Sequence, residues 1–224
     1  MKKEKSPTIE VEGIIYERIP IRTHVITDSD DIVDVAERYA REHIREGDIL
    51  FVSEKVVAVT QGRALREADM RIGLTARLLW RFVHASPYGV GLRRPSSMQC
   101  AVNECGVLRI WCATFAGALG KLLGRRGWFY RIAGMQAAAI DAAGTSPLQP
   151  DRVIMGPKDP DGVSNRLRDA LGIEACIVDV NDLGSNVLGA TEKLDRARVA
   201  AILRDNPLGQ KAEQTPLGII RVVG

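Results

Sequence analysis

The clearest pattern in the chain is a helical one in its first quarter. From Asp31 to Ile44, apolar residues recur at intervals of three and four, which places them on one face of a helix. Thr27 or Asp28 begins this helical segment, and Gly47 ends it. The apolar face includes His43, which we therefore expect to be a packed side chain.

β-Branched residues dominate several other segments, and we predict strands there. Residues 14–26 contain Pro20, which suits an edge strand or an extended lead-in, and residues 49–59 read as one buried strand. Further strands are expected at 106–112, 128–132, 153–155, 175–180 and 217–223. Helices are expected at 97–104, 163–171 and 192–204, with Asp161 and Thr191 capping the last two.

The composition indicates an ordinary globular protein. Hydrophobic residues make up 46% of the 224 residues and charged residues 26%. The net charge of +3 is small, the arginines are scattered and aromatic residues are only 5%, so we expect no nucleic-acid partner. No stretch of about 18 apolar residues and no leader-like segment is present, so we expect no membrane partner and a cytoplasmic location.

The cysteines and histidines lack the spacing of a metal site. The four cysteines have no CxxC pair, and His24, His43 and His84 are far apart. Buried thiols are the favoured interpretation. A redox-sensitive protein that uses Cys105 as its reactive thiol is a less favoured alternative.

Two polar features within apolar surroundings are candidates for chemistry. The loop 179–186 follows a predicted buried strand, and its Asp182 is suited to ligating Mg²⁺, although Asp and Asn also satisfy turn hydrogen bonds. Lys55, beside Glu54, could contact a phosphate or form a structural ion pair. No Walker loop or dinucleotide fingerprint is present.

An ordered set of motifs resembles a known family. The motifs are Ile19-Pro20, Asp30-Asp31, the segment 53–63, Arg126-Gly127-Trp128, Ala133-Gly134-Met135, the segment 157–168 and Asp182-Leu183-Gly184. Their order over nearly the whole chain is similar to that of the gamma-glutamyl ligases that add glutamate to the precursor of coenzyme F420. The set is much more specific than any one motif.

The resemblance implies both a fold and an activity. It implies an α+β fold with mixed or antiparallel sheets, flanking helices and an intertwined homodimer. The whole chain, 1–224, would be one ligase-like domain, with an inserted subdomain at about 64–127 as the alternative. The implied reaction joins an amino acid such as glutamate to a small-molecule carboxylate, with GTP or ATP as co-substrate and Mg²⁺ or Mn²⁺ as cofactor.

The resemblance also carries site residues over to this sequence, although it leaves the catalytic residues unknown. The residues implied to bind the nucleotide are Ile19, Pro20, Ile21, Arg22, Glu54, Lys55 and Gly184. The residues implied to hold metal ions are Asp182, Asp205, Glu213 and Thr215, where Asp205 or Glu213 would rebuild a second metal position.

Several positions depart from the family pattern. Val59 replaces a lysine that helps to hold the nucleotide, Asn206 replaces an acid, and Pro216 stands where the family has a carboxylate. Ser185 replaces an arginine, and Met135-Gln136 replaces Ile-Asp. These departures motivate an alternative, a non-catalytic nucleotide- or anion-binding protein that retains the fold.

Overall fold

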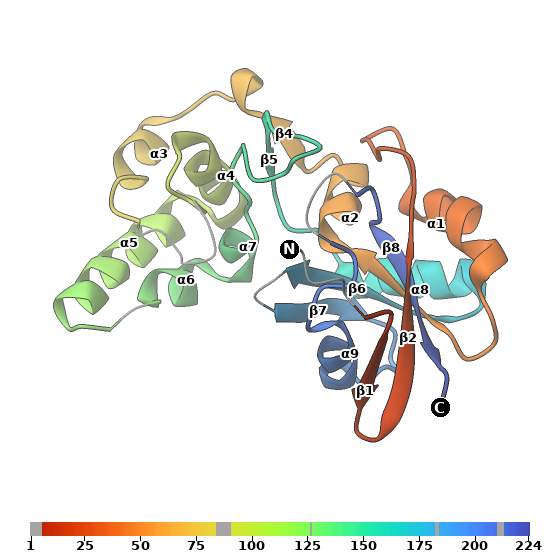
Figure 1. The fold of residues 1–224 in the computed structure, drawn as a ribbon. Helices are drawn as coiled ribbons and strands as arrows, with labels where there is room; N and C mark the ends of the chain where they lie inside the picture. Colours follow the sequence, from red (N-terminus) through yellow and green to blue (C-terminus); the bar gives the residue numbers. More distant parts are fainter. Residues whose placement is uncertain (1–5, 84–90, 126, 182–183, 210–212) are drawn as a thin grey trace. The chain divides into compact units, whose positions relative to one another are not determined.

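The computed structural model in Figure 1 describes residues 6–83, 91–125, 127–181, 184–209 and 213–224. The chain divides into two compact units. Unit 1 comprises Met1–Gln61 and Pro157–Gly224, and unit 2 comprises Gly62–Gly156. Unit 2 therefore ends well after residue 127, which is where the inserted subdomain considered from the sequence would end.

Unit 1 is built on a six-stranded mixed sheet with the strand order β1-β2-β8-β3-β6-β7. The parallel pair is β3 with β6, and the other neighbouring strands are antiparallel. The mixed sheet confirms the α+β class. The strands span Thr8–Val11 (β1), Ile14–Ile21 (β2), Ile49–Ser53 (β3), Glu174–Asn181 (β6), Gly184–Ala190 (β7) and Leu217–Val222 (β8).

Helices cover both faces of this sheet (Figure 1). The helices are α1 (Ile32–Ala40, followed by the 3-10 turn Arg41–His43), α2 (Glu54–Thr60), α8 (Pro160–Leu171) and α9 (Arg196–Leu203). Helices α1 and α8 pack together, and α8 lies against β6 and β7. Helix α9 contacts both β1 and β7, which are the two edge strands, so the sheet curls around α9.

The helix caps differ in part from those expected. Asp31 caps α1, and its Oδ1 accepts from the Val33 amide at 2.7 Å. Asp159, not Asp161, caps α8 through the Gly162 amide, and Asp195, not Thr191, caps α9. In both cases the cap is the aspartate directly before the first helical residue, and its carboxylate accepts from otherwise unpaired amides of the first turn.

The predicted packing of His43 is wrong, because its side chain is 50% exposed. The α-helix ends at Ala40 and tightens into a 3-10 turn at Arg41–His43. This change of winding turns the side chain out of the apolar face.

Two predicted strands at the sheet are shorter than expected. The predicted strand 49–59 ends at Ser53, and Glu54 starts α2, so Lys55 lies in the first turn of a helix. Val57, Ala58 and Val59 are buried there, so packing overrides the strand propensity of the two valines. Strand β2 ends at Ile21 rather than 26 and is internal, because it pairs with both β1 and β8. Pro20 lies beyond the last residue that pairs with β1, where a missing N–H leaves no partner unsatisfied.

Unit 2 is mostly helical within the part of the chain that the structure describes. Its elements are β4 (Ala64–Arg66), the 3-10 turn Glu67–Asp69, α3 (Leu74–Leu79), α4 (Pro95–Cys105), α5 (Val107–Leu122), α6 (Trp128–Ala133), α7 (Met135–Ala138) and β5 (Arg152–Ile154). Its core includes the fully buried Leu92, Met98 and Ile110. Strand β4 pairs with β5 in a separate two-stranded sheet.

The predicted strands at 106–112 and 128–132 are wrong, because both segments are helices. Short apolar runs do not distinguish a buried strand from a buried helix. Here small residues permit helix packing. A Cβ on Gly117 would lie 3.2 Å from the Phe129 Cβ, and one on Gly120 would lie 3.0 Å from the Trp128 ring. Helices α5 and α6 therefore approach closely.

Among the described residues, no single helix is long and apolar enough to cross a membrane. Helices α4 and α5 together meet the length and composition criteria, but the chain bends by 118° between them at Gly106.

Candidate functional site

The topology of the unit 1 sheet gathers several polar segments at one end. Strands β3 and β6 are parallel and Ser53 pairs with Val178, so both carboxyl ends lie at this end. Leu217, the first residue of β8, pairs with Val52 and also with Ile21, the last residue of β2. We call this region the polar sheet end. It comprises residues 19–23, 53–55, 179–181, 184 and 214–217.

Backbone hydrogen bonds hold these segments together. The Ser53 amide donates to the Pro216 carbonyl at 2.8 Å, and the Thr23 amide donates to the Gln214 carbonyl at 2.9 Å. The Thr215 hydroxyl donates to the Leu208 carbonyl at 2.6 Å, which fastens the turn 205–209 to the same region. The polar sheet end is therefore a defined part of the fold.

The structure brings all the predicted nucleotide-binding residues to the polar sheet end. Residues 19–21 are the last three residues of β2, and Arg22 directly follows the strand. Pro20 and Arg22 are exposed, whereas Ile21 is buried. Glu54 and Lys55 are half-buried at the start of α2. Gly184 begins β7 and pairs with Asn181. These residues surround one region although they are far apart in the sequence.

Of the predicted metal ligands, Asp182 lies outside the described residues. Glu213 and Thr215 lie directly before β8, and a Cβ on Gly209 would stand 1.4 Å from the Glu213 Oε2, so this carboxylate lies against the turn. The Thr215 oxygen donates its proton to a carbonyl and keeps lone pairs for a cation. Among the described residues, no three His, Cys, Asp or Glu side chains form a metal-binding group.

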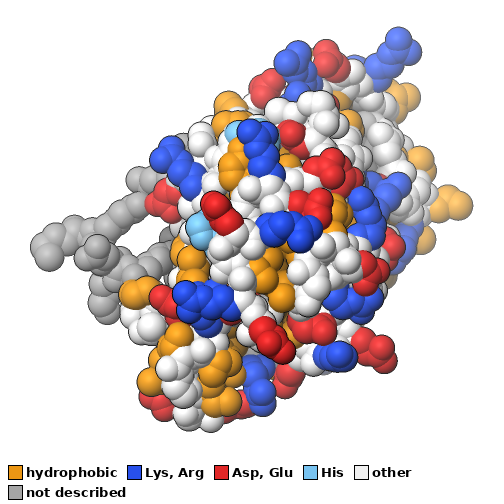
Figure 2. All heavy atoms as spheres, turned by 90° about the vertical axis from the view of Figure 1, so that its right-hand side faces the viewer, with side chains coloured by type: hydrophobic (Ala, Val, Ile, Leu, Met, Phe, Trp, Pro, Cys, Tyr) orange, Lys and Arg blue, Asp and Glu red, His pale blue; other side chains and the backbone are white. Residues whose placement is uncertain are grey.

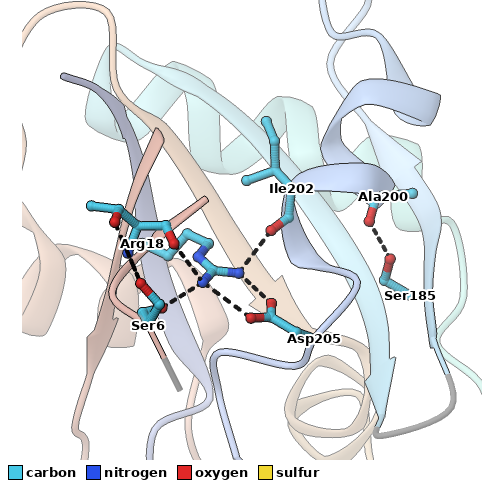
Figure 3. Close-up of polar contacts among 7 residues, drawn as sticks. Ser6, Arg18, Ser185, Ala200, Ile202 and Asp205 are labelled. Carbon is cyan, nitrogen blue, oxygen red and sulfur yellow. Dashed lines mark hydrogen bonds and ion pairs between the residues drawn. The ribbon is translucent and has the colours of Figure 1, made fainter. Parts of the chain in front are cut away.

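Asp205 is held by an arginine that the sequence did not single out (Figure 3). Both carboxylate oxygens of Asp205 pair with the Arg18 guanidinium, and the Nη2–Oδ2 distance is 3.2 Å. Arg18 is fully buried, whereas the Asp205 side chain is 41% exposed. Arg18 also donates to the Ile202 carbonyl at 3.0 Å in the last turn of α9 and to the Thr8 carbonyl at 3.4 Å in β1. Arg18 thus ties β2 to strand β1 and to helix α9.

Arg18 also compensates the carboxyl end of α9. Helix α9 has no basic residue in its own last turn, although a cation is favourable where carbonyl groups are unpaired. A guanidinium from β2 takes that position. The sequence gives no local signal for this, because 184 residues separate Arg18 from Ile202.

A second polar group next to the polar sheet end also escaped the sequence interpretation. His24 directly follows Thr23, and its ring lies between the Asp30 carboxylate, 3.1 Å from Nε2, and the Tyr39 hydroxyl, 3.0 Å from Nδ1. The amide of Thr27 lowers the pKa of Asp30 by hydrogen bonding to its carboxylate. This side chain is ionised at neutral pH and orients His24.

The cysteines do not favour a redox site. Burial raises the pKa of Cys105 above the usual thiol range, which lowers its thiolate fraction at neutral pH. Burial raises the thiol pKa of Cys100 to about 11 and that of Cys176 to about 12. None of the four cysteines forms a disulfide.

Acidic and basic side chains are interspersed over the face of the molecule in Figure 2, without a broad area of one sign. The fold and the polar sheet end together define an α+β protein whose candidate ligand-binding segments meet at the carboxyl ends of two parallel strands. The chain matches the family model of the F420-0:gamma-glutamyl ligases over residues 20–181 and belongs to this family. A comparison with curated proteins finds no match.

The matched segment divides the candidate residues into two groups. Pro20, Ile21, Arg22, Glu54 and Lys55 lie inside it. The four candidate metal ligands and Gly184 lie beyond it, since it ends at residue 181, and Ile19 lies just before it. The ligase-like assignment therefore rests on the part of the chain that includes the expected phosphate-binding lysine.

Proposed function

We propose that this protein is a nucleotide-dependent amide ligase that joins an amino acid, such as glutamate, to a small-molecule carboxylate. Family membership supports a ligase of this kind. The observation that carries the proposal is the convergence of residues 19–22, 53–55 and 214–217 at one end of the sheet. A homodimer in the cytoplasm is part of the proposal.

The proposed reaction has two balanced steps. A carboxylate oxygen of the acceptor attacks the terminal phosphorus of GTP or ATP, the nucleoside diphosphate leaves, and an acyl phosphate forms. The amine of the amino acid then attacks the acyl carbon, inorganic phosphate leaves and the nitrogen loses a proton. The protein's contribution is to position the reactants and to stabilise the phosphate charge.

Each candidate residue has a role in this proposal. Lys55 contacts a phosphate, Glu54 orients the start of α2, and residues 19–22 and Gly184 line the nucleotide. Asp182, Glu213 and Thr215 provide oxygen donors, which suit Mg²⁺ or Mn²⁺. A bound divalent ion would neutralise phosphate charge.

Asp205 has a competing interaction. Its two oxygens already accept from Arg18, and a divalent ion at the same carboxylate would stand close to the buried guanidinium. We propose that Asp205 contributes to a metal site only by its remaining lone pairs, and that Glu213 and Thr215 are the main donors of the second position.

Nucleotide binding tests the role of Lys55. Titration calorimetry with GTP and with ATP, each with Mg²⁺ or Mn²⁺, should show binding, and Lys55→Ala should weaken it about 10- to 100-fold, as expected for loss of a charged hydrogen bond. Lys193→Ala is the matched control, because Lys193 is 85% exposed and lies 3.9 Å from Glu174 at the other end of β6. Absence of binding by any nucleotide contradicts the ligase proposal.

Turnover tests the ligase step itself. Phosphate release should require both a carboxylate acceptor and an amino acid, and Asp182→Asn should abolish it. Glu46→Gln is the matched control, because it removes one exposed carboxylate just before the amino end of β3. Equal losses in the two variants would contradict a metal role for Asp182.

The second candidate function is a binding protein without turnover. Its support is Val59, which is only 4% exposed on α2, so this position offers no cation to a phosphate. Nucleotide binding with no amino-acid-dependent phosphate release would favour this candidate over the ligase.

A further inference from the structure

Exposed apolar side chains gather in one short part of unit 2. Among the described residues, sixteen large hydrophobic side chains are exposed, and eight of them lie between residues 105 and 140. Six of the eight belong to helix α5 (Figure 1) and the residue directly after it, and we call them the α5 apolar face. They are Val107, Leu108, Phe115, Leu119, Leu122 and Leu123.

The α5 apolar face is too broad for the contact of a single helix. Four of its members lie along one line of the helix, and Val107 and Leu123 extend it to either side. At about 100° per residue the face therefore spans about 160°. The opposite side of α5, which includes Ile110 and Ala113, is already buried in the core of unit 2. A second helix covers a narrow stripe, whereas a flat lipid surface covers a broad one.

The charges around this face are all positive. From residue 105 to residue 140 the sequence contains five Lys and Arg and no Asp or Glu. Unit 2 as a whole has thirteen Lys and Arg and five Asp and Glu, a net charge of +8, whereas unit 1 has eighteen and twenty-three, a net charge of −5. Such unequal charge within one chain favours an anionic partner for the basic part. A surface that is both apolar and anionic is complementary to the α5 apolar face.

We propose that the α5 apolar face docks on the surface of an anionic lipid membrane, with α5 parallel to that surface. Its side chains enter the boundary between headgroups and acyl chains, and the exposed Arg109, Lys121 and Arg125 stay at the level of the anionic headgroups. From the sequence we expected no membrane partner, because no apolar stretch is long enough to span a bilayer. A contact at the membrane surface needs no such stretch.

A second copy of the chain is the less suitable occupant of this face. Two α5 helices that face each other bring together the five cations of segment 105–140 from both copies, and this segment has no acid to compensate them. Like charges that oppose self-association attract anionic lipid instead.

Cosedimentation of the full chain with vesicles tests the proposal. It needs neither nucleotide nor ligase substrate, so its outcome is independent of the proposed function. We expect binding to phosphatidylcholine vesicles that contain about 30% phosphatidylserine, and at least about 10-fold weaker binding to pure phosphatidylcholine or at about 0.5 M rather than about 0.05 M salt. Phe115→Glu and Leu122→Glu, at sites 71% and 84% exposed, should each weaken binding about 10-fold or more, because each places an anion in the contact.

Tryptophan fluorescence reports which part of the chain enters the lipid. All three tryptophans lie in unit 2, and Trp111 lies in α5, so lipids with brominated acyl chains should quench the fluorescence of the bound chain. The matched control is Val223→Glu, which changes a valine that is 50% exposed at the carboxyl end of unit 1 and should leave binding within about twofold.

Absence of binding to the anionic vesicles overturns the proposal. So does binding that Phe115→Glu and Leu122→Glu both leave unchanged, or binding without quenching by the brominated lipids. A chain that binds no vesicles but forms a dimer in sedimentation, and loses this dimer in the same two variants, would assign the α5 apolar face to a second copy instead.

Discussion

Removing the Asp205 carboxylate should destabilise unit 1 even in the absence of any metal ion. The Asp205→Ala change leaves the buried Arg18 guanidinium with its carbonyl partners but without a counter-charge. A buried charge without its partner is costly, whereas a hydrophobic replacement of the charge itself costs less. We therefore expect Asp205→Ala to be more harmful than Arg18→Met.

The burial of the Arg18–Asp205 pair determines how much unfolding free energy each variant loses. Loss of one partner from a fully buried pair costs about 3–5 kcal/mol. Arg18 is fully buried but the Asp205 side chain is 41% exposed, so water can partly replace the lost carboxylate. We expect about 2–3 kcal/mol for Asp205→Ala, below that range. For Arg18→Met we expect about 1–2 kcal/mol, because the Nε of Arg18 already lacks an acceptor among the described residues.

The distribution of tryptophan provides an internal control for this measurement. Trp80, Trp111 and Trp128 all lie in unit 2, whereas the pair lies in unit 1. Urea unfolding followed by amide hydrogen exchange at β2 and α9 reports on unit 1, and tryptophan fluorescence reports on unit 2. In both variants the amides of β2 and α9 should lose their protection from exchange at lower urea concentration than in the unchanged chain.

The reasoning is refuted if Asp205→Ala leaves the protection of β2 and α9 unchanged in metal-free buffer, or if Arg18→Met is the more harmful change. A loss that appears only when Mg²⁺ or Mn²⁺ is present would assign Asp205 to metal binding rather than to the ion pair. Metal-free and metal-loaded samples therefore have to be compared in one series.

Three further predictions concern packing, thiols and pH. Gly218→Ala should destabilise unit 1 by about 1–3 kcal/mol in urea unfolding, because its Cβ would lie 2.3 Å from the ring of the fully buried Phe51; no loss would show that the ring moves freely. At pH 8 a maleimide should label the exposed Cys112 first, while Cys100 and Cys176, with thiol pKa values of about 11 and about 12, should react only after unfolding; rapid labelling of Cys176 would contradict its burial. The pKa of Asp30 is lower in the folded chain than in the unfolded chain, so its stabilising effect is present above about pH 4 and is lost as the pH falls; Asp30→Asn should therefore flatten the acid limb of the stability profile, and an unchanged limb would exclude this contribution.

The sequence patterns that predicted elements correctly are those in which either apolar periodicity or turn-forming residues clearly dominate the segment. The three-and-four spacing after Asp31 predicted α1, and the turn signals around residue 160 predicted α8. Within the predicted strand 49–59, residues 49–53 do form β3. The prediction failed for 54–59 and for 106–112, where β-branched and aromatic residues occupy helices. In those segments tertiary packing decides, and packing partners such as Phe129 for α5 are not visible in a local window.

The candidate site was predictable only as a set of unconnected residues. The resemblance implied one nucleotide site for Lys55 and residues 19–22. The sheet topology brings these residues to the same end of the sheet, because β2 and β3 both pair with β8 at Leu217. The Arg18–Asp205 pair and the His24–Asp30 contact had no such signal. Neither pair has a spacing in the sequence that indicates a contact. The curl of the sheet around α9 brings Arg18 to Asp205, and the path of the chain after β2 brings His24 to Asp30.

The division between the matched segment and the rest of the chain has a structural consequence. Strand β8 lies beyond the segment that matches the family, yet it is the central connection between β2 and β3. The bond that fixes its start runs from the Ser53 amide to the Pro216 carbonyl, so it does not depend on the side chain at position 216. The departures at Ser185, Asn206 and Pro216 can therefore change the chemistry of the polar sheet end while the backbone around Lys55 stays the same.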